Sequence, residues 1–181
     1  MSQIFLKGIE KPSGRTVEVS GTPPLSFVRM FGPATSTPIA ADQWTSIVLD
    51  PAGEPWQQFG EPTWEAIMPG DPDYDEFGAG VRCIQEGLFS FTGSIIYNAI
   101  HGTGDRGIDI REVKGPREGL WDLVLGIPMP KVVDAPLLVS GESYQSVGNI
   151  VQLRGYSTVA TSTTENPRSE WLSIALISPS E

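Results

Sequence analysis

The fold of this chain is decided by the stretch Gly87-Leu88-Phe89-Ser90-Phe91-Thr92-Gly93-Ser94-Ile95-Ile96-Tyr97. Apolar side chains stand at the odd positions Phe89, Phe91, Ile95 and Tyr97, while Ser90, Thr92 and Ser94 at even positions are small and polar. A period of two is typical of a β-strand that buries one face and leaves the other partly open. The stretch therefore predicts a long strand of an antiparallel sheet.

Further strands are expected on both sides of this stretch. Arg106–Val113 also alternates, and we expect it to form a long hairpin with Gly87–Tyr97 around the loop His101–Asp105. The other predicted strands are Trp44–Leu49, Gly80–Ile84, Leu137–Ser140, Ile150–Tyr156, Ser157–Thr161 and Trp171–Ile177. No run of about 11 residues without Gly or Pro has the apolar spacing of an amphipathic helix. Short runs punctuated by 20 Gly and 16 Pro residues predict an all-β sandwich or barrel.

The N-terminal segment differs from the rest of the chain. Its apolar runs, Ile4-Phe5-Leu6 and Val17-Glu18-Val19, are too short to form a core, and prolines interrupt the sequence that follows. We therefore expect an extended N-terminal arm at residues 1–35, which pairs with or inserts into a neighbour, and one β-domain at residues 36–181. A disordered chain end is the alternative interpretation of the arm.

Composition and charge exclude several classes of protein. The 181 residues carry a formal net charge of −10, from 22 acidic and 12 basic residues, without a cluster of Lys and Arg. Nucleic-acid binding, which needs a basic face, is therefore rejected. No apolar run reaches the roughly 18 residues that a membrane-spanning helix requires, and Met1–Lys7 lacks the apolar stretch of a signal peptide. We expect no membrane insertion and no secretion signal.

Motifs that could support catalysis are weak in this sequence. Gly102–Gly107 matches the dinucleotide-binding pattern G-x-G-x-x-G, but the alternating residues after it predict a strand rather than the required helix. His101 is the only histidine, Cys83 is the only cysteine, and no G-x-S-x-G elbow occurs. We predict no catalytic residues, no cofactor and no enzymatic activity, with Cys83 as a small buried side chain.

The densest acidic run is a candidate for calcium. Asp71, Asp73 and Asp75 alternate as the first ligands of a calcium loop do, but Glu76 stands where that loop needs glycine. A solvated loop without metal is the competing interpretation, and we favour it.

Aromatic residues gather in Gly53–Gly80, which contains Trp56, Phe59, Trp64 and further aromatic side chains among Pro and Gly. In a loop-rich segment such residues either plug the end of a sandwich or form a contact surface for sugars or proteins. We favour plugging.

Five segments between Trp44 and Ile177 resemble, in order, the strands of the tumour-necrosis-factor-like (TNF-like) jelly roll, which complement globular heads and many bacteriophage head and tail proteins share. The segments are Trp44–Asp50, Ile84–Phe91 (similar to I-x-x-x-G-x-Y-x-F), Gly104–Ile110 (similar to G-x-R-x-I-x-I), Leu137–Gly141 with Val147–Leu153 (similar to L-x-x-G-D-x-V-x-L), and Trp171–Ile177. Phe89 and Asn149 replace the usual Tyr and Asp. The resemblance implies an all-β, two-sheet antiparallel jelly-roll sandwich with an extended N-terminal arm.

Members of this family are usually compact homotrimers, so the resemblance also implies a subunit interface. We expect it on the second apolar face of the last strand, together with a tyrosine, because a monomer would expose too large an apolar patch there. The expected interface residues are Tyr156, Trp171, Ser173, Ala175 and Ile177.

The resemblance implies a bacteriophage virion structural protein that forms a trimer on the particle surface. It would serve as a capsid decoration protein, or as a small tail or baseplate protein contacting the host. Its arm would bind other virion proteins, and its surface would bind a host glycan or protein. The alternative is a soluble complement-like recognition module that binds glycans or proteins.

Overall fold

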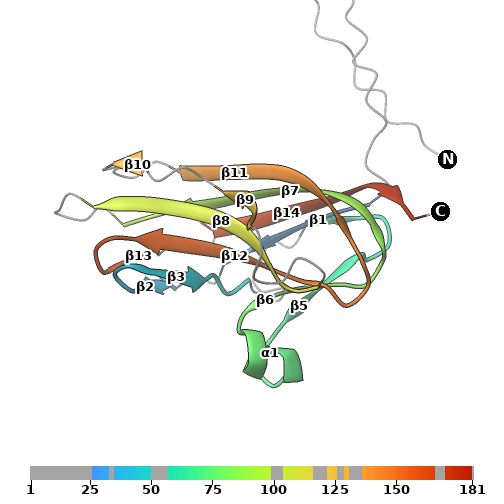
Figure 1. The fold of residues 1–181 in the computed structure, drawn as a ribbon, viewed down its shortest axis with the longest axis horizontal. Coiled ribbons are helices and arrows are strands. Elements are labelled where there is room, and N and C mark those ends of the chain that lie inside the picture. Colours follow the sequence, from blue (N-terminus) through green and yellow to red (C-terminus); the bar gives the residue numbers. More distant parts are fainter. Residues whose placement is uncertain are drawn as a thin grey trace, which may run out of the picture.

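The computed structural model describes residues 26–32, 35–49, 57–98, 104–115, 122–125, 129–130, 136–165 and 170–180. Within these ranges the chain forms strands β1 to β14 and a single short helix, α1. The strands build a sandwich of two main antiparallel sheets (Figure 1). The prediction of an all-β, two-sheet antiparallel sandwich is confirmed.

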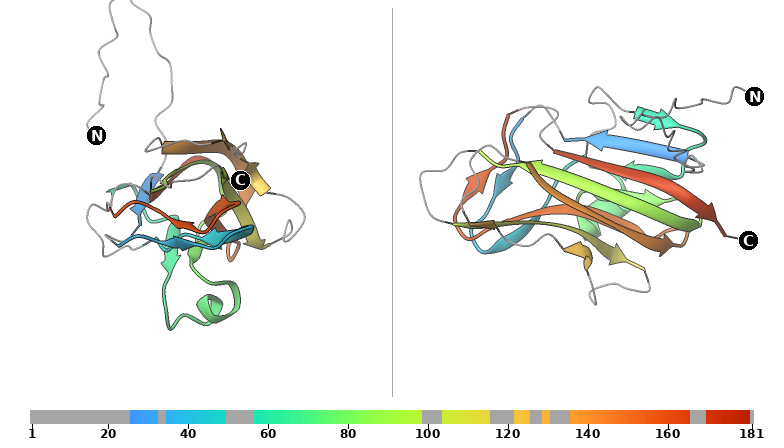
Figure 2. Two further views of the ribbon diagram at one scale, coloured as in Figure 1. Left: turned by 90° about the vertical axis from the view of Figure 1, so that its left-hand side faces the viewer. Right: turned by 90° about the horizontal axis from the view of Figure 1, so that it is seen from above.

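One layer is a five-stranded sheet with the order β11–β7–β14–β1–β4, which Figure 2 shows from above. Its strands are β11 (Pro136–Gln145), β7 (Gly87–Ile96), β14 (Glu170–Pro179), β1 (Ser26–Phe31) and β4 (Gln57–Phe59). The central position belongs to β14, in agreement with its nearly continuous apolar sequence.

The second layer has the order β10–β8–β12–β6–β5, and β9 also pairs with β8. Its strands are β10 (Met129–Pro130), β8 (Asp105–Lys114), β12 (Ile150–Ser157), β6 (Gly80–Cys83), β5 (Trp64–Ile67) and β9 (Asp122–Leu125). Two short strands, β2 (Pro38–Ile39) and β13 (Thr161–Ser162), pair with each other, and β3 (Gln43–Ser46) lies beside β12. The predicted strand at Trp44–Leu49 therefore ends early, although the residues after it remain buried.

The hydrophobic core lies between the two sheets, where alternate side chains meet. Phe89 and Phe91 of β7 are fully buried, and their ring centroids lie 5.2 and 5.6 Å from that of Trp64 on β5. Trp64 is therefore buried in the core, as predicted, whereas the prediction is wrong for Phe59, which is 58% exposed. At Gly93 a Cβ atom would lie 2.6 Å from Leu153 Cδ1 of β12, so the close approach of the sheets requires glycine there.

The predicted hairpin between Gly87–Tyr97 and Arg106–Val113 is wrong. β7 pairs with β11 and β14, whereas β8 lies in the other sheet and pairs with β12. A period of two identifies the inward side of a strand but not its partner. The Tyr97 hydroxyl joins the two layers instead, because it donates to Gly107 O at 2.7 Å and accepts from the Tyr156 amide at 3.0 Å.

Two predicted boundaries also need correction. Residues 26–31, which we placed in the arm at 1–35, form β1 between β14 and β4, with Val28 and Met30 in the core. We missed this strand because prolines lie on both sides of it. The domain therefore does not begin at residue 36. The rest of the predicted arm, residues 1–25, lies outside the described residues. Ser157–Thr161 is not a strand, because Ser157 ends β12 and Thr161 begins β13.

Candidate functional site

The outward side of the five-stranded sheet is the surface best suited to contact another molecule. Core residues define the inward side of each strand, so the residues between them point outward. Because paired residues of neighbouring strands share a face, the registers arrange the outward residues in rows. The first row contains Phe59, Phe27, Ala175, Ser90 and Glu142; the second contains Arg29, Ser173, Thr92 and Ser140; the third contains Phe31, Trp171, Ser94 and Leu138. We call these rows, with Ile177 on β14 and Tyr144 on β11, the outer face.

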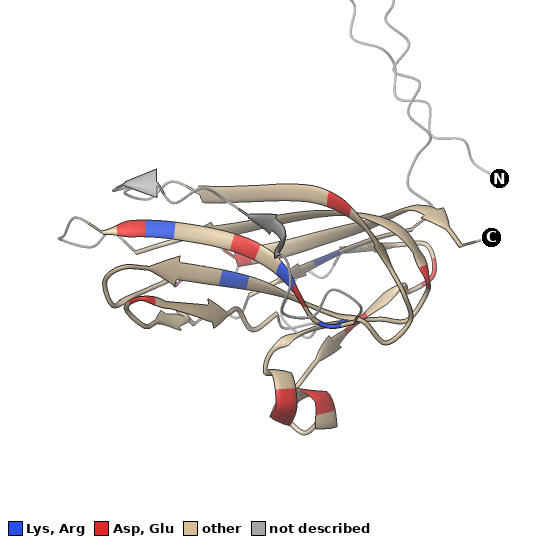
Figure 3. Cartoon of the chain, viewed as in Figure 1, with Lys and Arg blue, Asp and Glu red and all other residues tan. Residues whose placement is uncertain are grey.

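The outer face combines large apolar side chains with small hydroxyl residues and carries little charge, and its members Phe31 and Ser94 are buried. Four of the six exposed large hydrophobic side chains in the described chain lie on it: Phe59, Leu138, Tyr144 and Ile177. The five strands contain the charged residues Arg29, Glu142 and Glu170, and the last of these is buried on the inward side. By contrast, β8 in the second sheet carries alternating acidic and basic residues along its length (Figure 3). Because the chain has a net charge of −10, a surface with so few charged residues would repel another copy only weakly.

Arg29 lies across the outer face. Its Nε donates a hydrogen bond to Ser173 Oγ at 2.6 Å. Its guanidinium carbon lies 4.7 Å from the ring centroid of Trp171 and 5.5 Å from that of Phe27, which is cation–π geometry. Our sequence analysis missed this residue because it assigned β1 to the arm, although the apolar alternation of Val28 and Met30 around it was a usable signal.

Four of the five predicted interface residues come together on β14. Trp171, Ser173, Ala175 and Ile177 all belong to the outer face, where Ile177 is 42% exposed and Ser173 is buried. Tyr156 does not join them, because it lies on β12 in the other sheet. The sequence did not reveal that β12 and β14 belong to different layers.

Tyr156 has contacts of its own at one end of the second sheet. Its ring centroid lies 5.2 Å from that of Trp44 on β3, and its hydroxyl donates to Asp42 Oδ1 at 3.3 Å. Both rings are half-buried, whereas Asp42 is exposed. This pair is separate from the outer face.

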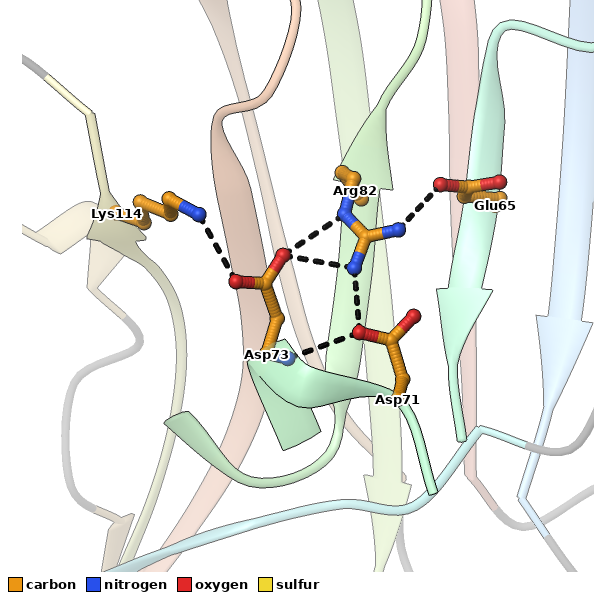
Figure 4. Close-up of polar contacts among 5 residues, drawn as sticks. All are labelled: Glu65, Asp71, Asp73, Arg82 and Lys114. Carbon is orange, nitrogen blue, oxygen red and sulfur yellow. Dashed lines mark hydrogen bonds and ion pairs between the residues drawn. The ribbon is translucent and has the colours of Figure 1, made fainter. Parts of the chain in front are cut away.

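The calcium candidates lie at α1 (Pro72–Phe77), which projects from the second sheet (Figure 1). Asp71 caps the helix by accepting from the Asp73 amide at 2.9 Å, and Pro72 occupies the first turn. The carboxylates of Asp71 and Asp73 both bind Arg82 of β6, with its Nη2 at 2.6 Å from Asp71 Oδ1 and 2.7 Å from Asp73 Oδ2 (Figure 4).

Further ion pairs complete this cluster. Lys114 Nζ lies 2.9 Å from Asp73 Oδ1, and Arg82 Nη1 lies 2.6 Å from Glu65 Oε1 (Figure 4). The hydrogen bonds from Lys114 and Arg82 hold the pKa of Asp73 below its ordinary value. In the described part of the chain, no group of three or more His, Cys, Asp or Glu residues is arranged to hold a metal. The cluster attaches α1 to the sheet, and the three aspartates are not brought together as calcium ligands.

The remaining sequence candidates are the glycine motif beside His101 and the single cysteine. His101, Gly102 and Thr103 lie outside the described ranges, whereas the residues from Asp105 form a strand, as predicted, rather than a helix. Cys83 is buried, as predicted, and burial raises the pKa of its thiol to about 12, which suppresses the nucleophilic thiolate. Among the described residues, no helix is long and apolar enough to cross a membrane.

Comparison with solved structures identifies the fold as a TNF-like jelly roll. The vertex protein P5 of phage PRD1 superposes with a TM-score of 0.55 at 15% identity, covering 86% of this chain and 99% of that chain. Murine APRIL gives a TM-score of 0.52 at 15% identity, covering 83% and 98%. The Eiger TNF of S. frugiperda gives a TM-score of 0.51 at 11% identity, covering 88% and 96%. Neither a scan of protein-family models nor a search of curated proteins gave a match.

The chain is thus a TNF-like jelly-roll module.

Proposed function

We propose that this chain is a structural protein of a bacteriophage virion, which acts as a non-enzymatic homotrimeric module on the particle surface. The outer face is the observation that carries the proposal. A lone subunit would expose Phe59, Leu138 and Ile177 on one surface with little charge, and assembly would remove these side chains from water. The predicted interface on β14 lies in the middle of this surface.

The fold of a known phage vertex protein supports the placement on a virion. The position of the chain ends supports it further. Ser26 pairs with Leu176 near the end of β14, so the described chain begins and ends at the same end of the sandwich (Figure 1). An arm formed by the residues before Ser26 would bind capsid or tail proteins from that end. The opposite end, around Asp42, would then face outward, and three linked copies would bind a host surface more tightly than one.

A soluble recognition module is the second candidate. The half-buried pair Trp44–Tyr156 beside the exposed carboxylate of Asp42 favours this second function. Sugar rings stack on aromatic side chains, and sugar hydroxyls donate hydrogen bonds to carboxylates. In this case the protein would bind a glycan or a protein without belonging to a particle.

Two binding assays on the purified full chain separate these functions. The first measures binding to assembled particles of the phage that encodes it, and the second measures binding on a glycan array. Association with particles supports the virion protein, whereas glycan binding without any association with particles supports the recognition module. Hydrolysis of a sugar polymer would contradict the non-enzymatic role in both.

A further inference from the structure

The two charged residues of the outer face lie toward its opposite margins. Arg29 is on β1 and Glu142 is on β11, and these strands are separated by β14 and β7. Three strand spacings of about 4.8 Å place the two backbones about 14 Å apart. Glu142 is exposed, and no described residue forms an ion pair or hydrogen bond with its carboxylate. The two charges therefore do not pair within one subunit.

We propose that Arg29 of one copy binds Glu142 of the neighbouring copy, so that the β11 edge of each subunit lies against β1 and β14 of the next. This inference rests on the proposed homotrimer and names the contact that directs its assembly. The contact places the Arg29 margin of one subunit against the Glu142 margin of the next.

Arg29 is already positioned for such a contact. The hydrogen bond to Ser173 uses Nε, and the guanidinium carbon lies within cation–π distance of the rings of Trp171 and Phe27. Both terminal Nη atoms remain available among the described residues, and they can bind the two oxygens of a carboxylate together. A fixed guanidinium loses less rotamer entropy on binding than a free one does, and Arg and Trp are enriched at the centres of interfaces.

The β11 margin supplies the complementary group. Leu138, Ser140, Glu142 and Tyr144 point outward from the same side of this edge strand, so Glu142 lies between Ser140 and Tyr144, whose hydroxyl donates to Glu86 Oε1 at 2.7 Å. Leu138 and Tyr144 are 61% and 44% exposed. On the other margin, aromatic rings flank Arg29. Apposition of the two margins puts apolar groups against rings and removes the ion pair from water.

The centre of the outer face permits this approach. Ala175, Ser90 and Thr92 are small and lie between the margins, so they leave room for the edge strand of a neighbour. None of them carries charge that would have to be desolvated.

A second copy of this chain is the partner that these features fit. Every copy carries both the Arg29 margin and the Glu142 margin, and a contact between two different surfaces closes into a ring when it is repeated by rotation. Copies with a net charge of −10 repel one another at long range, so their contact surface needs a local attraction.

Charge reversal in the full-length chain tests the pairing. Native mass spectrometry and light scattering over a dilution series would compare the wild type with Arg29→Glu, Glu142→Arg and the double variant. Each single reversal should raise the concentration at which the oligomer half-dissociates by at least about 30-fold. The double reversal should bring the half-dissociation concentration most of the way back to that of the wild type. Glu165→Arg, at an exposed position outside the outer face, is the control for net charge, and circular dichroism checks that each variant is folded.

The outcomes separate the two proposals. Dissociation by both single variants, with rescue in the double variant, supports the pair. If the wild type is a trimer but the single variants remain trimeric, or the double variant does not regain the trimer, the Arg29–Glu142 contact is wrong. The proposed trimer is unaffected by either result. A wild-type monomer throughout the dilution series overturns the trimer and the contact together.

Discussion

Replacing Glu170 with glutamine should change how stability depends on pH. Glu170 opens β14, its side chain is 1% exposed, and it fills the space left by Gly32, where a Cβ atom would lie 2.1 Å from Glu170 Oε2. The Thr37 hydroxyl donates to Oε2 at a long 3.4 Å, and Oε1 has no hydrogen-bond partner among the described residues. Burial raises the pKa of this carboxyl from 4.5 to about 7, and it outweighs the opposing effect of the hydroxyl groups of Thr163 and Thr37.

The sign and size of the effect follow from proton linkage. Because the folded-state pKa lies above the unfolded one, the folded protein binds this proton more tightly between pH 4.5 and about pH 7. The contribution of Glu170 to the free energy of unfolding is fully present below pH 4.5 and is lost as the pH rises to about 7. At about 1.36 kcal/mol per pH unit, the loss is about 3 kcal/mol. Glutamine has nearly the same shape but does not titrate, so the Glu170→Gln variant should not lose stability in this way as the pH rises.

Urea denaturation of both proteins, at one protein concentration and at pH 4.5 and pH 8, measures this effect. The stability of Glu170→Gln relative to the wild type should rise by about 3 kcal/mol between the two pH values. Glu165→Gln, at an exposed position, should show no rise of that size. A stability difference between Glu170→Gln and the wild type that stays constant with pH would refute the reasoning.

Three further perturbations test the packing of the sandwich. Cys83, whose thiol pKa is raised to about 12 by burial, should resist Ellman's reagent at pH 8 until urea unfolds the protein, and fast labelling of the native state would contradict its burial. Gly93→Ala should lower the free energy of unfolding by about 1–3 kcal/mol in urea denaturation, because the added Cβ would lie 2.6 Å from Leu153 Cδ1; unchanged stability would mean that the sheets can separate there. Arg154→Met removes an ion-pair partner of the fully buried Asp109 and should cost about 3–5 kcal/mol in the same assay, whereas a loss below about 1 kcal/mol would show that other contacts compensate the charge of Asp109.

The sequence predicted the nature of the strands better than their pairing. The alternation in Gly87–Tyr97 correctly placed Phe89, Phe91 and Ile95 toward the core. The same alternation could not show that β7 and β8 lie in different sheets, because inward residues look alike in both layers. Helix α1 also escaped prediction, although Asp71 followed by Pro72 is a usual start of a helix. With only six residues it is too short for an apolar period to appear.

The candidate site was predictable along one strand but not across the sheet. The apolar residues on both faces of Trp171–Ile177 indicated a covered strand, and β14 is indeed central. Arg29 and Glu142 reach the same face only through the registers of four neighbouring strands, which are long-range contacts without a local sequence signal. Asp71 and Asp73 resembled calcium ligands in the sequence because the basic side chains that bind them, Arg82 and Lys114, come from distant strands.

The central claim is that the outer face joins copies of this chain. Its most direct test is the native mass of the full chain beside that of Ala175→Glu, which places a charge in the middle of the face without changing the core. We expect the wild type to be a trimer of 19.6 kDa subunits at micromolar concentration and the variant to be a folded monomer. A wild type that is monodisperse as a monomer, or a variant that remains trimeric, would contradict the claim.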